Sequence, residues 1–338
     1  MAGGHKSLKR IIHRCFEEFR ATCEIAKVTS LKKALITFAA KVDIQKMNHN
    51  GYKEPPKVKA RLMKKHDIMI EYFEKRFEEF YNNYDYNQVL PETSSKFRNR
   101  IWVCWWQGEE NAPILVQKCI ESIRKSAKNH VVTVITEDNY RDFVNIPDWF
   151  IDKFDKGILS RTNFSDLLRV SLLAQYGGMW LDSTFFCTAD TDLDMYFKYD
   201  LWSIKRPDYL HCSIASGYFA GYSLQCSYEQ RYIFAVIRDF FLHYWQNSKM
   251  LIDYLLIDYM IVLAQKYDQR IENLFESIVP NNPFCDDLLW LLNEKFDSQK
   301  WKELTKNTYL YKLSWKYSFV EELDGEKTFY AKLIENKL

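Results

Sequence analysis

The sequence predicts an α/β fold whose central sheet is mostly parallel and Rossmann-like at its start, preceded by a helical N-terminal region. Residues 1–95 contain few glycines and repeat apolar residues at helical spacing. From Arg100 onward, short apolar segments alternate with helical ones, which is typical of a parallel sheet covered by helices. The length of 338 residues allows an appendage and one large domain, expected at 1–95 and 96–338.

The N-terminal region is predicted to form helices separated by Pro55 and Pro56. Residues 1–35 contain eight basic and three acidic residues, a net charge of +5. A basic amphipathic helix is typical of a peripheral contact with an anionic membrane. The same charges are equally consistent with a solvated helix face.

Downstream of Arg100 we expect the elements in the following order. Strands are predicted at 101–106, 130–135, 179–181, 201–204 and 217–221, and helices at 113–127, 148–156, 163–176, 228–247, 253–267 and 284–296.

Composition and missing motifs exclude several functions. A net charge of +2 does not favour nucleic acid as a partner. Eight scattered cysteines without a C-x-x-C pair argue against a zinc site and for reduced thiols. The sequence lacks a P-loop, a G-x-G-x-x-G motif, a G-x-S-x-G elbow and H-E-x-x-H. It has no signal-peptide core and no apolar run of about 18 residues, so we expect a cytoplasmic protein.

The segment 163–184 contains the most informative residues. Asp166 and Arg169 lie three positions apart and therefore share one helix face. Asp182 follows a short strand, where a carboxylate can bind a divalent ion and the diphosphate of a ligand. Asp182 could instead cap a turn, and Asp166 could belong to a helix start with Asn163 as the N-cap. Arg169 could simply pair with Asp166, although a largely buried helix favours a ligand partner.

These residues resemble a known family. The runs Phe164–Arg169 and Tyr176–Thr184 are similar to those of DXD-containing sugar transferases, most closely the capsular polysaccharide synthesis branch. More distant similarity is to yeast-type initiating mannosyltransferases and the glucosylating domains of clostridial toxins. Residues 101–108 resemble the opening strand of that family, and the resemblance covers about residues 98–320.

The resemblance implies a GT-A fold and retaining transfer of a hexose from a nucleoside-diphosphate sugar, with UDP preferred to GDP. Trp106 would stack on the base, and Asp166 and Arg169 would hold sugar hydroxyls. Trp180 and Asp182 would lie at the ribose and the metal. The implied donor site comprises Trp106, Gln107, Asp166, Arg169, Trp180, Asp182, Ser183, Thr184, Ser314, Trp315 and Lys316.

One position departs from the family pattern. The second carboxylate of the D-x-D motif is replaced by Thr184. Either Asp182 alone recruits Mn²⁺ or Mg²⁺ together with diphosphate oxygens, or metal dependence is reduced. Asp190 and Asp192 are poorly spaced substitutes.

The acceptor side is expected at Ser216, Gly217 and Asp258, although for Asp258 an exposed helix acid is the slightly favoured interpretation. The predicted acceptor is a growing glycan in capsular or surface polysaccharide synthesis. The basic N-terminal helix suggests that it is lipid-linked and that the protein sits at the inner face of the membrane. Two alternatives remain: an inactive sugar-binding or assembly protein, and an aspartyl-phosphate phosphatase, for which Thr184 lacks the required acid.

Overall fold

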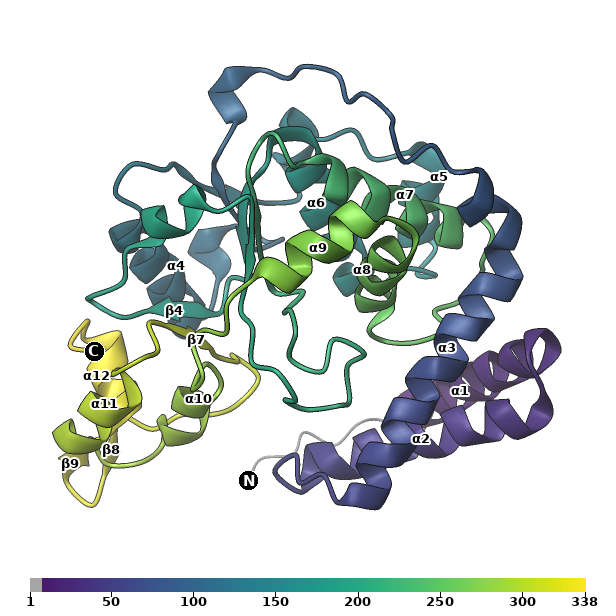
Figure 1. Cartoon of the computed structure of the whole chain (residues 1–338). Helices are drawn as coiled ribbons and strands as arrows, with labels where there is room; N and C mark the ends of the chain where they lie inside the picture. Colours follow the sequence, from purple (N-terminus) through teal and green to yellow (C-terminus); the bar gives the residue numbers. More distant parts are fainter. Residues whose placement is uncertain (1–7) are drawn as a thin grey trace.

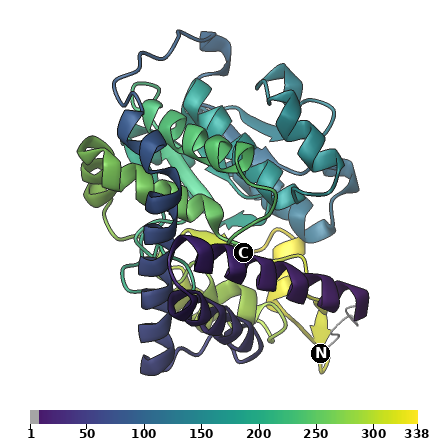
Figure 2. The same ribbon diagram turned by 90° about the vertical axis from the view of Figure 1, so that its right-hand side faces the viewer.

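Three helices form the N-terminal part of the computed structural model, which describes the backbone of residues 8–338 and the side chains from Phe16 onward. They are α1 (Leu8–Val28), α2 (Leu31–His49) and α3 (Pro56–Asn83). Figures 1 and 2 show α1 and α2 packed together against the long α3. Pro56 opens α3, where its missing N–H costs nothing, and Ser30 caps α2 by accepting a bond from the Lys33 amide. The predicted break at Pro55–Pro56 is confirmed, and helices occupy most of 8–83, but residues 84–94, which were also expected to be helical, have no helix.

A five-stranded sheet with the order β2-β1-β3-β6-β5 forms the centre of the molecule. β1 (Ile101–Cys104) pairs in parallel with β2 (Val132–Ile135) and with β3 (Gly178–Leu181). β6 (Ser223–Cys226) is antiparallel to both β3 and β5 (Leu201–Ser203). Only β6 therefore runs against the other four strands, and the predicted α/β fold with a mostly parallel sheet is confirmed.

The two faces of this sheet are covered by different helices. Trp102 and Trp180 belong to the core shared with α6 (Arg161–Tyr176) and α7 (Tyr232–Gln246). Ile101, Val103 and Met179 point to the opposite face, where α4 (Ile114–Ser126) covers them. This alternation is the two-residue period of a strand buried on both faces. Figure 1 shows α4 on one side of the sheet and α6 and α7 on the other.

The N-terminal helices share the larger of these cores. Ile25 of α1 and Phe73 of α3 are buried in the same apolar cluster as Trp102 and as Tyr259 of α8 (Leu256–Tyr267). Polar contacts join α3 to the rest of the chain as well, because His66 bonds the Tyr259 hydroxyl and the His211 carbonyl. The helices α1, α2 and α3 are thus docked on the sheet domain and form its helical extension.

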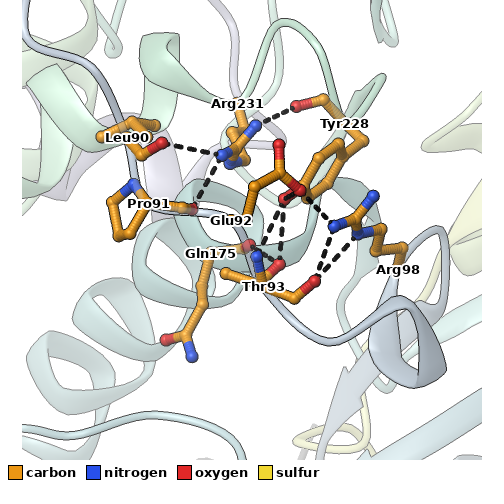
Figure 3. Close-up of polar contacts among 8 residues, drawn as sticks. All are labelled: Leu90, Pro91, Glu92, Thr93, Arg98, Gln175, Tyr228 and Arg231. Atoms are coloured by element: carbon orange, nitrogen blue, oxygen red, sulfur yellow. Dashed lines mark hydrogen bonds and ion pairs between the residues drawn. The ribbon is translucent and has the colours of Figure 1, made fainter.

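Backbone carbonyls and side chains of the segment between α3 and β1 bind it to the sheet domain (Figure 3). Arg231 donates to the carbonyl oxygens of Leu90 and Pro91. The Thr93 hydroxyl donates to the Gln175 carbonyl, and the Arg98 guanidinium lies 3.7 Å from the ring centroid of Tyr228. These contacts satisfy polar groups in a segment without regular secondary structure.

A C-terminal subdomain packs beside α4 (Figure 1). Its pairing strands are β4 (Phe185–Cys187), directly after the Asp182 turn, and β7 (Leu310–Lys312). The subdomain also contains α10 (Asp287–Leu291), α11 (Ser298–Leu304), β8 (Glu322–Leu323), β9 (Glu326–Lys327) and α12 (Phe329–Ile334). Two further helices, α5 (Asp148–Asp155) and α9 (Gln269–Ser277), pack in the larger core of the sheet domain.

Several predicted boundaries are wrong. Residues 217–221 form a loop rather than a strand, because Gly217 has a φ of +80° and packs against the Arg206 carbonyl; the strand lies at 223–226. The N-cap of α6 is Ser160, and Asn163 completes its capping box as the third helical residue. The first strand ends at Cys104 instead of 106, and the helix expected at 284–296 is only α10.

Membrane-spanning helices and disulfide bonds were not expected from the sequence. None of the helices within residues 8–338 is long and apolar enough to cross a membrane. The seven cysteines from Cys23 onward are free thiols.

Candidate active site

A cleft of about 760 Å³ opens at the carboxyl ends of β1 and β3. This is where open α/β sheets bind ligands. Its walls come from the residues after these strands, from α6, from the loop 204–222 between β5 and β6, and from the segment 312–316 after β7. The predicted site residues that line it are Trp106, Gln107, Asp166, Arg169, Trp180, Asp182, Ser183, Thr184, Gly217, Asp258, Ser314, Trp315 and Lys316.

Ser216 is the predicted residue that does not line the cleft. It is buried with a φ of +45°, within the same turn as Gly217. A Cβ on Gly217 would lie 1.9 Å from the Arg206 carbonyl oxygen, so the glycine is required by the loop's own packing. Of the substitutes considered for Thr184, Asp192 forms an ion pair with Lys128, and neither it nor Asp190 lines the cleft.

Arg169 lies between Asp166 of α6 and Asp182 after β3 and so connects the two runs 164–169 and 176–184. Its guanidinium lies 3.5 Å from Asp166 and 3.4 Å from Asp182, and 5.1 Å from the ring centroid of Trp180. The residue is only 7% exposed. Its Nε is buried with no hydrogen-bond partner in the protein. Because an unsatisfied buried donor is costly, this N–H is available for an oxygen of a ligand.

Asp182 is held in place by three donors. The Trp180 indole N–H donates to Oδ1 at 3.0 Å, Arg169 approaches the same oxygen, and Lys312 Nζ lies 3.3 Å from Oδ2. Burial alone would raise the pKa of Asp182, but Lys312 and Arg169 outweigh it and hold that pKa below its usual value. Trp180 is 1% exposed and packs in the apolar core, and its indole N–H is the group that contacts Asp182.

Two further carboxyl groups are buried in the cleft. Burial raises the pKa of Asp166 to about 7 and that of Asp258 to about 6. The Ser213 hydroxyl donates to Asp258 Oδ2 at 2.6 Å. A Cβ on Gly221 would meet Asp258 Oδ1 at 2.8 Å and the Arg169 guanidinium at 3.4 Å, so these two side chains reach the same point of the loop 204–222. Asp258 is buried, and the interpretation as an exposed helix acid is wrong.

Aromatic rings line the end of the cleft that is formed by the residues after β1. The ring of Trp106 is 5.5 Å from that of Tyr140 and 4.9 Å from that of Phe164, centroid to centroid. Trp105 packs edge-on against Trp315 at 5.8 Å, and its indole N–H is buried without a partner. Trp315 is 46% exposed. Flat rings with an unused N–H suit a planar ligand that carries acceptor oxygens.

Three cationic residues of the cleft were missed by sequence reasoning: Arg161, Arg206 and Lys312. Lys312, at the end of β7, contacts both Asp182 and Thr184. Arg206 donates to Asp286 and to the Tyr222 hydroxyl, both at the cleft wall. The only signal for Lys312 was its place in the segment 312–316, and nothing local marks Arg206.

The residues around Asp182 do not form a metal-binding set. Among the described side chains, no three His, Cys, Asp or Glu residues gather in a way that could hold a metal ion. Thr184 and the Oδ2 atom of Asp182 face the ammonium of Lys312, where a divalent ion would have to lie. The donor set therefore does not fit an ion held by Asp182 and Thr184.

A mostly parallel sheet that gathers Arg169, Asp166, Asp182, Asp258 and aromatic rings at its carboxyl edge is typical of an α/β enzyme that binds its ligand at that edge. The chain belongs to the family of capsular polysaccharide synthesis proteins, whose family model matches residues 50–333. This match begins directly after α2 and includes all of α3, so it starts before the region of the resemblance.

Among solved structures, this chain is similar to an apo structure of the bifunctional glycosyltransferase WbbM. The two share 9% sequence identity at a TM-score of 0.38, over 95% of this chain and 70% of the other. No curated protein matches the sequence.

Proposed function

We propose that this protein is a retaining hexosyltransferase that uses a UDP-sugar to extend a glycan in capsular or surface polysaccharide synthesis. The observation that supports this most strongly is that Trp106, Asp166, Arg169 and Asp182 line one cleft although they come from three different elements. The cleft volume of about 760 Å³ lies within the range that accommodates a nucleotide-sized ligand.

In the proposed complex, the base stacks on Trp106 and the donor sugar lies against Asp166, Arg169 and Asp258. The unpartnered Nε of Arg169 supports this arrangement, because its N–H can donate to a sugar hydroxyl or a phosphate oxygen. The segment 312–316 lines the cleft, and its residues Ser314, Trp315 and Lys316 border the diphosphate in this complex.

Retention is proposed to occur by attack from the face of the leaving group. The bond between the sugar C1 and the β-phosphate oxygen breaks, and its electron pair stays on that oxygen. The acceptor hydroxyl oxygen forms the new bond to C1, and its proton passes to the departing phosphate. A covalent intermediate needs a free carboxylate nucleophile. Asp182 is engaged by three donors, Asp166 is paired with Arg169, and Asp258 accepts a bond from the Ser213 hydroxyl, so none of the three is a free carboxylate.

A donor screen tests this function. UDP- and GDP-hexoses are incubated with the full chain and glycan acceptors, and NMR reads the anomeric configuration of the product. We expect consumption of a UDP-hexose with retention. Arg169→Lys should lower kcat/KM by about 100-fold, because a lysine cannot span Asp166 and Asp182 while donating to a ligand.

Arg238→Lys on α7, whose ion pair with Asp239 lies outside the cleft, is the matched control and should keep full activity. An inverted product would overturn the proposed stereochemistry. Binding of UDP-sugars without turnover over the whole acceptor panel would make the protein a sugar-nucleotide-binding protein instead of an enzyme.

The acceptor is proposed to be lipid-linked and reached at an anionic membrane surface. Phe16 and Phe19 of α1 are exposed, as are Leu31, Leu35 and Phe38 of α2. The spacing of these apolar side chains puts each set on one face of its helix. Arg20, Lys27 and Lys32 lie exposed on the same two helices and complement anionic lipid. Lys6 and the side chains of Lys9, Arg10 and Arg14, which entered the prediction, lie outside the described residues.

A further inference from the structure

Lys312 reaches the turn after β3 from the far end of the chain. β7 pairs antiparallel with β4, and Lys312 is in register with Phe185. Next to it, the Leu313 amide donates to the Thr184 carbonyl at 2.9 Å. The Lys312 amide itself donates to the Cys285 carbonyl at 2.8 Å. The backbone at Lys312 is therefore held on both sides, which fixes the point from which its side chain reaches the turn.

The Lys312 ammonium lies between the two side chains that would serve as metal ligands. Nζ is 3.3 Å from Asp182 Oδ2 and 2.5 Å from Thr184 Oγ1, and its side chain is only 23% exposed. In a full D-x-D motif, a second carboxylate would stand where Thr184 stands. Here a neutral hydroxyl meets an ammonium, which leaves the pair Asp182–Lys312 with no net charge.

A divalent ion at this point would face two fixed positive charges. It would have to displace Lys312 from Asp182 while Arg169 remains 3.4 Å from the other carboxylate oxygen. Like charges at such distances repel strongly in a partly buried site. Mg²⁺ commonly binds through one or two carboxylates and phosphate oxygens, and here the one carboxylate is already neutralised.

We propose that Lys312 is the resident cation of this site and replaces the divalent ion in binding the donor diphosphate. The inference rests on the proposed function. The ammonium contacts a β-phosphate oxygen and offsets the charge that accumulates there when the bond to the sugar C1 breaks. The electron pair of that bond stays on the phosphate oxygen, the acceptor proton goes to it, and Lys312 keeps its own protons throughout. Thr184 and Asp182 position the ammonium.

Calorimetric titration with UDP tests the proposal on the full chain. Wild-type protein is titrated in excess chelator and again in Mn²⁺, and the two dissociation constants should agree within about 2-fold. Lys312→Met keeps the aliphatic stem and loses the charge, so UDP should bind about 10- to 100-fold more weakly in chelator. Lys312→Arg restores a cation and should bind more tightly than Lys312→Met.

Lys302→Met, at an exposed position of α11 away from the cleft, is the matched control and should bind UDP like the wild type. Thermal unfolding of each variant confirms that it is folded before binding is compared. Wild-type binding that is lost in chelator and restored by Mn²⁺ would overturn the role of Lys312 and leave the proposed transferase intact. A Lys312→Met variant that binds UDP normally in chelator would overturn it too.

Failure of the proposed function gives a different result. If neither UDP nor UDP-sugars bind under either condition, the nucleotide-sugar site itself is refuted, and the inference about Lys312 falls with it.

Discussion

Asp166 combines complete burial with a neighbouring arginine. Burial raises its pKa to about 7 although Arg169, 3.5 Å away, opposes the rise. A carboxyl group whose pKa is raised on folding binds its proton more tightly in the folded state. Its contribution to stability is therefore complete below the pKa of the unfolded chain, about 4. It is lost as pH rises toward about 7.

Asp166→Asn should accordingly stabilise the protein more at pH 8 than at pH 5. The amide cannot ionise, so the variant avoids the cost of a buried carboxylate that the wild type bears at high pH. The measurement is the melting temperature of both proteins at the two pH values. The exposed Asp67→Asn on α3 is the control and should show no such difference. An equal effect of Asp166→Asn at both pH values would contradict the expected protonation of Asp166.

The junction of α6 and β3 depends on two glycines in the left-handed region. Gly177 ends α6 with a φ of +62°, and Gly178 begins β3 with a φ of +93°. A Cβ on Gly178 would lie 2.3 Å from the Arg100 carbonyl, since β1 and β3 are neighbours there. The position of Asp182, four residues later, depends on this close approach.

Gly178→Ala adds two costs, the strain of a positive φ and the clash of the new Cβ with the Arg100 carbonyl. We expect the free energy of unfolding to fall by several times the cost of the strain alone, or the variant not to fold. Gly157→Ala separates the two effects, because Gly157 has a φ of +69° but open space around its Cβ position. Its expected cost is only about 1–2 kcal/mol. Urea unfolding measures both. Similar losses in the two variants would show that the contact with Arg100 is unimportant.

The exposed apolar faces of α1 and α2 lead to a prediction about membranes. Phe16→Ser and Phe19→Ser together should reduce flotation with vesicles of anionic lipid, because Phe19 is 64% exposed and makes an apolar anchor. The same substitutions should leave transfer to a soluble acceptor unchanged. As a control, Val89→Ser alters an exposed apolar residue in the segment between α3 and β1. Undiminished flotation of the double variant would exclude this face as the contact.

The helical extension is joined to the sheet domain by a buried ion pair. Lys65 Nζ of α3 lies 2.8 Å from Asp253 Oδ2, and both side chains are almost fully buried. Asp253 lies three residues before α8, which bears Asp258, so α3 supports the wall of the cleft that holds Asp258. The extension therefore has a structural role in the site although none of its described residues lines the cleft.

Lys65→Met should lower the free energy of unfolding by about 3–5 kcal/mol, because it leaves the Asp253 carboxylate buried and unpaired. The double variant Lys65→Met/Asp253→Asn removes that charge and should recover part of the loss. Urea unfolding of the full chain compares the two. A double variant as unstable as Lys65→Met would mean that packing, and not the charge, accounts for the effect.

Much of the fold could be predicted from local patterns. The helix at 161–176, its glycine stop and the strand before Asp182 depend on side-chain period and on φ values within a few residues. Asp166, Arg169 and Asp182 were found for that reason. The strand predicted at 217–221 failed because the Gly217 turn is required by the Arg206 carbonyl, which the local pattern does not reveal.

The primary structure alone thus determined the sheet class, the order of its first elements and the carboxylates at its edge, since periodicity and chirality act between near neighbours. The meeting of Lys312 with Asp182 was decided only in three dimensions. It requires β7 to pair with β4 across more than a hundred residues. Such long-range pairing follows from how whole helices and strands pack, and short stretches of sequence contain little information about it.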